Sequence, residues 1–154
     1  MSNRGSNPPS GSSYKSPTTQ ELQTIIKEDA EVSARKTIAV AEELAKQLVE
    51  AKLKAAQIRL IFSKVRQIEA RSTASETVAT SGASDTVPLD GTTLREILLL
   101  KPRISYQSKR TPSLIELERV LIPLIDLVKT RRDFQRFVDF LEAVVAYHKV
   151  KGGE

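Results

Sequence analysis

Basic side chains gather in two short stretches of the sequence. Six Lys and Arg residues fall within residues 51–71 and four within residues 101–110, although the net charge of the whole chain is only +5. Clustered Lys and Arg release counterions when they neutralise phosphates, so this pattern favours a polyanion as partner. The same charges could instead only keep helix faces solvated, and the composition alone leaves both interpretations open.

Helical spacing places the first basic stretch on two lines. At about 100° per residue, Lys52, Arg59 and Arg66 follow one flank of an apolar face, and Lys64 and Arg71 follow the other. If both stretches met on one face, they would form a groove of cations that binds RNA through its backbone, without sequence readout. The predicted RNA-binding residues are Arg59, Lys64, Arg66, Lys101, Arg103 and Arg110.

One aromatic residue, Tyr106, stands among the cations of the second stretch. A tyrosine beside cations can stack on a base or donate a hydrogen bond, which suits a nucleic acid. A tyrosine in a helical pattern is more often part of the hydrophobic core, however. The sequence therefore favours a core position for Tyr106 over base stacking.

Catalytic side chains are scarce. The chain has no Cys and one His, which argues against the usual zinc sites and against a Cys–His nucleophile pair. The sequence contains no P-loop and no Gly-x-Ser-x-Gly elbow. The single His148 falls on an apolar stripe in a last helical turn, where it is more typical of a packed residue. We expect a protein that is not an enzyme and has no catalytic residue, metal or cofactor.

Helix signals dominate the first half of the chain. Residues 1–19 are rich in Ser and Pro and predict a disordered tail, and residues 20–154 a single helical domain. Thr18 and Glu21 match a capping box that opens the first helix. No Pro or Gly occurs from there to Arg71, and the period weakens only around residues 27–31, where we expect a break.

The second half predicts three further helices. Residues 72–92 lack Lys and Arg and predict a mobile loop, ended by a capping box at Thr93–Glu96 before a short helix over residues 94–100. Pro102 marks a kink or a restart. Thr111–Pro112 opens a helix in which Pro123 predicts a bend or an early stop. Thr130 caps the last helix, which ends at Gly152–Gly153. The expected fold is all-α, a compact bundle of about five to six helices.

Three segments together resemble a known family. The first is Gln57-Ile58-Arg59 with Phe62, Val65 and Ile68; the second is Leu99-Leu100-Lys101-Pro102-Arg103-Ile104-Ser105-Tyr106 with Arg110; the third runs from Phe134 through Glu142-Ala143-Val144-Val145-Ala146-Tyr147-His148 to Gly-Gly. Their order and character resemble the small helical subunit of the type III-A CRISPR effector, the Csm complex. The resemblance covers residues 37–153.

The resemblance implies a non-catalytic protein of antiviral defence. The short apolar runs and the absence of Cys make the cytoplasm the expected compartment. Family members stack in several copies beside the crRNA–target RNA duplex and contact the other subunits. The expected partners are therefore crRNA and target RNA, sister Csm subunits and further copies of the chain, with no membrane contact. The alternative is a helical scaffold or adaptor that binds protein and no nucleic acid.

Two structural expectations accompany this interpretation. Phe62, Phe137, Leu141 and Val144 should be buried, with the last helix packed against residues 58–68. Self-association needs uncovered apolar surface, for which Leu94, Ile97 and Leu98 are the candidates, although each of them could instead complete the core of the monomer.

Overall fold

Helices account for almost the whole described chain. The computed structural model describes residues 14–76 and 86–154. The helices are α1 (Thr19–Lys27), α2 (Ala30–Glu50), α3 (Ala55–Glu76), α4 (Gly91–Leu98), α5 (Leu100–Arg110), the 3-10 turn η1 (Pro112–Leu114), α6 (Ile115–Leu127) and α7 (Arg131–Val150). Only Leu99, itself helical in backbone, separates α4 from α5, so they act as one interrupted helix. The predicted all-α bundle is confirmed.

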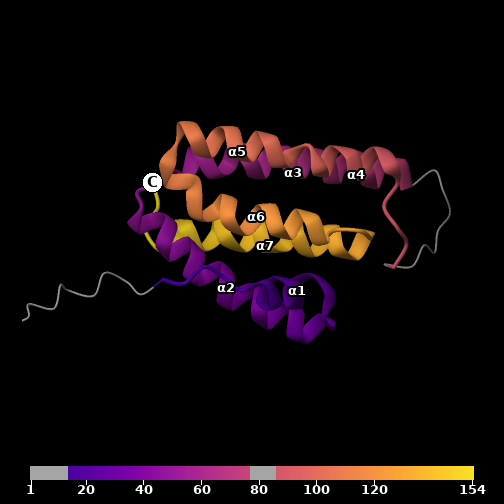
Figure 1. The fold of residues 1–154 in the computed structure, drawn as a ribbon, viewed down its shortest axis with the longest axis horizontal. Helices are drawn as coiled ribbons and strands as arrows, with labels where there is room; N and C mark the ends of the chain where they lie inside the picture. The colour runs from indigo at the N-terminus through magenta and orange to yellow at the C-terminus, as the bar shows by residue number, and fades with distance from the viewer. Residues whose placement is uncertain (1–13, 77–85) are drawn as a thin grey trace, which may run out of the picture.

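The helices form three layers (Figure 1). α6 and α7 lie in the middle, with α1 and α2 on one side and α3, α4 and α5 on the other. α7 packs most extensively on α2 and also contacts α3, while α6 contacts α1 and α5. The last helix therefore does pack against α3, as predicted, but its main partner is α2.

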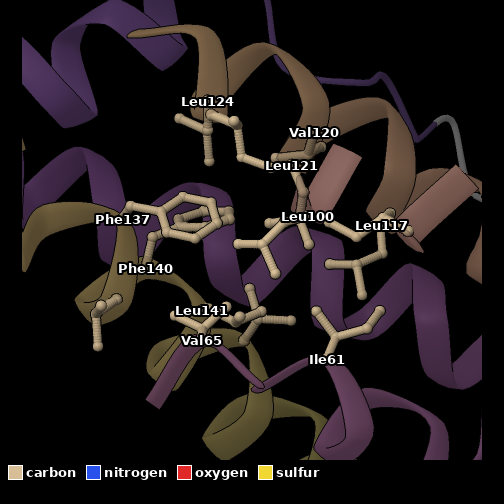
Figure 2. Close-up of a cluster of buried hydrophobic side chains, with 14 of the residues drawn as sticks. Ile61, Val65, Leu100, Leu117, Val120, Leu121, Leu124, Phe137, Phe140 and Leu141 are labelled. Atoms are coloured by element: carbon tan, nitrogen blue, oxygen red, sulfur yellow. The ribbon is translucent and has the colours of Figure 1, made fainter. Parts of the chain in front are cut away.

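The core is a single cluster of aliphatic and phenylalanine side chains. Figure 2 shows Leu100 of α5, Leu121 of α6 and Phe137 of α7 converging with residues of α3. Phe137, Leu141 and Val144 are fully buried, as predicted. Phe62 is only half-buried at the edge of the cluster, so the prediction for Phe62 was wrong. Its ring instead lies under the Arg66 guanidinium, 5.8 Å from the ring centroid.

Capping boxes mark where two of the helices begin. Thr18 and Glu21 form the predicted capping box of α1, and Thr130 and Asp133 form another at α7. Asp133 is buried, and burial raises its pKa, but bonds from Lys27 Nζ (2.6 Å) and from two backbone N–H groups outweigh this and hold the pKa below its ordinary value. The Lys27–Asp133 pair thereby ties α1 to α7.

Three predicted helix boundaries differ from the structure. α4 begins at Gly91, so Thr93 is a buried residue inside the helix and forms no capping box. Thr111 precedes η1 as predicted, but its side chain accepts no capping hydrogen bond. α6 continues four residues beyond Pro123, so the early stop was wrong.

The break between α1 and α2 falls at residues 28–29, as predicted, but a second break was missed. α2 ends at Glu50, where Lys52 adopts a left-handed conformation with φ of 64°. The N–H of Leu53 donates to Leu48 O and that of Lys52 to Val49 O, the two bonds of a Schellman motif. Glycine usually occupies this position and thereby marks the end of a helix in the sequence. Because a lysine stands here instead, the sequence did not predict that α2 ends at this point. Lys52 therefore does not share a helix with Arg59 and Arg66.

The predicted tail and loop lie partly within the described residues. Residues 1–13 of the tail and 77–85 of the loop lie outside the described residues. Tyr14 packs against the core; burial, together with Glu116 and Glu43, raises its pKa to about 12. Residues 72–76 extend α3, and Leu89 N–H donates to Lys129 O beside a bridge between Pro88 and Thr130.

Candidate nucleic-acid interface

A furrow follows the seam between α3 and the α4–α5 arm. Its apolar half has a volume of about 370 Å³ and is lined by Leu60, Ile61, Lys64, Leu100, Arg103, Ile104, Tyr106 and Gln107. Its basic half, of about 250 Å³, is lined by Lys64, Arg71, Arg95, Glu96, Leu99, Leu100 and Arg103. Lys64, Leu100 and Arg103 line both halves, so the two hollows lie next to each other. We call the whole feature the furrow.

Helical register explains why these side chains meet. Lys64 and Arg71 are seven residues apart on α3 and therefore share one flank of that helix. Arg103, Tyr106 and Arg110 are spaced i, i+3 and i+7 on α5 and share a face in the same way. The core residues Ile61, Leu100 and Ile104 line the seam between α3 and this arm, and α3 contacts α4 directly. The structure thus places Lys64 and Arg71 of the first basic stretch and Arg103 of the second along the same furrow.

The basic half contains more positive than negative charge. It is lined by four cations and one carboxylate, namely Lys64, Arg71, Arg95, Arg103 and Glu96. The carboxylate of Glu96 pairs with Arg71 Nη2 at 3.1 Å. Several cations in a concave surface concentrate positive potential, because the protein walls exclude solvent. Arg71 and Arg95 were not among the predicted RNA-binding residues. The seven-residue spacing from Lys64 to Arg71 was the signal that could have found Arg71.

The six predicted residues divide into two groups. Lys64 and Arg103 line the furrow, and Arg110 lies over the Tyr106 ring, 5.7 Å from its centroid. Arg66 is on the opposite flank of α3, where it pairs with Glu69 at 2.6 Å. The exposed Arg59 lies about 140° around α3 from Lys64. Lys101 points to α6 and pairs with Asp126 at 2.7 Å.

Tyr106 differs from its expected position. Its side chain is 60% exposed, so the favoured core position was wrong. The residue follows Ser105 and precedes Gln107 on α5, whose buried face is formed by Leu100, Ile104 and Ser108. A four-residue step from 100 to 104 to 108 leaves position 106 on the outer side of the helix. An aromatic ring therefore stands at the mouth of the furrow.

A second hollow, of about 380 Å³, lies at the start of α7. Arg131, Arg132 and Arg136 line it together with Glu69 and Asp139. Arg136 donates to Ile26 O and Glu28 O at the end of α1, and burial lowers its pKa. Arg136 thus serves to join α7 to α1, and the carboxylates give this hollow mixed charge. The furrow is the better candidate for a polyanion.

The three candidates for self-association divide into buried and exposed residues. Ile97 is fully buried and Leu94 is packed against the core, so both complete the core of the monomer. Leu98 is 43% exposed and the neighbouring Leu99 is 42% exposed. These two leucines remain as apolar surface beside the basic half of the furrow.

Other kinds of site find no support in the described residues. In residues 14–76 and 86–154, no three His, Asp or Glu side chains gather as metal ligands do, and no helix is long and apolar enough to cross a membrane. His148 is buried, and its Nε2 lies 2.8 Å from Leu53 O. It packs in the core as expected and joins α7 to the start of α3.

Comparison with known proteins identifies the family. No curated protein and no solved structure matches the chain. The family model described as Csm2 Type III-A, in contrast, matches residues 31–154. That range runs from α2 to the end of α7 and includes both sides of the furrow. The chain therefore belongs to the Csm2 family and is a small subunit of the type III-A CRISPR Csm complex.

Proposed function

We propose that this subunit binds the RNA of the Csm complex through its phosphate backbone, with the furrow as the contact surface. It would act without catalysis in the cytoplasm, as part of antiviral defence. Several copies would stack along the crRNA–target RNA duplex and contact the sister subunits. The single observation that carries the proposal is the meeting of Lys64, Arg71, Arg95 and Arg103 in one concave surface.

Ion pairing supports the furrow over the other predicted residues. The Arg66 and Lys101 side chains each have a carboxylate partner within 2.7 Å, so binding a phosphate would break an existing pair. No carboxylate lines the apolar half of the furrow, where Lys64 and Arg103 project. Ion pairing therefore favours Lys64 and Arg103 over Arg66 and Lys101 as phosphate contacts. The proposed contacts are Lys64, Arg103 and Arg110, with Arg71 and Arg95 in support.

The salt dependence of RNA binding tests this proposal. Each phosphate contact with single-stranded RNA contributes about 0.7 to the slope of log affinity against log salt. The double variant Lys64→Ala/Arg103→Ala should therefore lower the slope by about 1.4. Fluorescence anisotropy with a labelled oligonucleotide at several salt concentrations measures it.

Arg59→Ala/Arg66→Ala is the matched control, because it removes two charges from the same region of α3 outside the furrow. It should change the slope by less than the furrow variant. An equal or larger effect of the control would move the RNA path to the other flank of α3. If the parent binds no RNA, the scaffold or adaptor alternative takes its place.

Stacking of copies predicts a dependence on RNA length. A head-to-tail contact that does not close can propagate, and RNA that aligns neighbouring copies raises their effective concentration. Native mass spectrometry should show the number of bound copies rising stepwise with RNA length. Leu98→Asp, at an exposed position, should reduce the number of copies on long RNA while one copy still binds short RNA. One copy, or one dimer, at every length would contradict stacking.

A further inference from the structure

We propose that the apolar half of the furrow holds the base of one unpaired RNA nucleotide, stacked against Tyr106. This inference rests on the proposed RNA binding and adds to it a base-binding subsite. Backbone binding alone needs only cations and places no demand on the apolar half. It does not explain why an exposed tyrosine stands beside an apolar hollow that has two cations at its rim.

The hollow has the size and the composition of a ligand site. Its volume of about 370 Å³ falls at the lower end of the range of about 300–1,000 Å³ for small-molecule pockets. Leu60 is 59% exposed and Tyr106 is 60% exposed, so both apolar side chains face solvent at its mouth. Ile61, Leu100 and Ile104 form its floor. A flat, largely apolar ring such as a nucleobase would cover this surface.

The polar groups fit a nucleotide better than they fit a peptide. Lys64 and Arg103 at the rim would meet the phosphates on either side of an inserted base. Gln107 carries both a donor and an acceptor, which can pair with the edge of a base. No carboxylate lines the hollow, so nothing there would repel a phosphate. This charge pattern favours a polyanion that also has apolar rings, and RNA is such a molecule.

The tyrosine ring is held in place before binding. The Arg110 guanidinium lies over it at 5.7 Å from the centroid, a cation–π contact within one turn of α5. Stacking on aromatic rings tolerates any base, so the subsite would not read sequence. It would instead distinguish an unpaired nucleotide from a paired one, because a paired base is held within its own helix.

Three RNA duplexes of the same length test this inference on the full chain. One is perfectly paired, one has a single unpaired uridine, and one has an abasic nucleotide in place of that uridine. We expect the parent to bind the duplex with uridine about five- to 150-fold more tightly than the abasic one, the range that corresponds to stacking on one aromatic side chain. Tyr106→Ala should remove this preference and leave the slope against log salt unchanged. Tyr106→Phe, which retains the ring, should keep the preference.

The outcomes separate this inference from the proposal beneath it. Equal binding of the uridine and abasic duplexes by the parent would overturn the base subsite, while a salt-dependent affinity for all three duplexes would leave backbone binding standing. An equal loss on all three duplexes in Tyr106→Ala would also overturn it. If Tyr106→Ala binds RNA normally but no longer associates with further copies or sister subunits, the hollow is a protein-docking surface and the inference fails. Because Tyr106 is exposed, thermal unfolding of the variant should match the parent.

Discussion

Truncating Phe137 to Ala is expected to lower the free energy of unfolding by about 3–5 kcal/mol. Phe137 is fully buried, and Figure 2 shows its ring within the cluster that also contains Leu100 of α5 and Leu121 of α6. The variant loses the transfer free energy of the ring and leaves a cavity that rigid neighbours cannot fill. Such a loss is a large share of the roughly 5–15 kcal/mol that stabilises a domain.

Urea unfolding followed by circular dichroism measures this loss. For a chain of this size, 1 kcal/mol corresponds to about 2–4 °C in Tm, so the expected decrease is roughly 6–20 °C. Phe62→Ala is the matched control, because Phe62 is the same residue type but only half-buried. Its effect should be clearly smaller. A decrease of only a degree or two for Phe137→Ala would mean that α7 does not lie where the structure places it.

Replacing Gly153 with Ala is expected to destabilise the protein by about 1–3 kcal/mol, the usual cost of an added group in a filled space. A Cβ atom at this position would overlap the imidazole ring of His148. That ring is 2% exposed and cannot easily move, since its Nε2 lies 2.8 Å from Leu53 O. Either the ring or the chain at residues 152–154 must shift.

Gly91→Ala is the control for this substitution, because open space surrounds a Cβ there and the backbone is helical. It should be neutral or slightly stabilising. In a His148→Ala background, Gly153→Ala should cost much less, because the clash is gone. Equal costs in both backgrounds, measured by denaturant unfolding, would show that the contact with His148 is not the cause.

Local signals in the sequence were sufficient for most of the fold. Two capping pairs, Thr18–Glu21 and Thr130–Asp133, lie where α1 and α7 begin in the structure. The apolar stripe of α7 likewise coincides with its buried face. The break after α2 could not be predicted in this way. It depends on Lys52 in a left-handed conformation and on contacts of Leu53 with α7, which a local pattern does not contain.

The candidate interface was predictable only in part. Helical spacing places Lys64 and Arg59 on different flanks of α3. The local sequence does not show which of these flanks lies beside α5. That choice depends on tertiary packing, in which Ile61, Leu100 and Ile104 are all buried in the one core cluster. Exposure of Tyr106 follows from the same choice, because the four-residue steps of α5 turn position 106 outward. Tertiary packing therefore determines which of the basic side chains meet in the furrow, whereas the sequence shows only that they are clustered.

The junction between α2 and α3 has a consequence for the order of folding. Ala55 N–H donates to Glu154 O at 2.7 Å, and Leu53 O contacts His148, so residues about a hundred positions apart close this corner (Figure 1). Closing so long a loop carries an entropic cost that is recovered only when the rest of α7 has docked. We expect the α2–α3 corner to form after the transition state for folding. Substitutions there should accelerate unfolding and leave the refolding rate nearly unchanged.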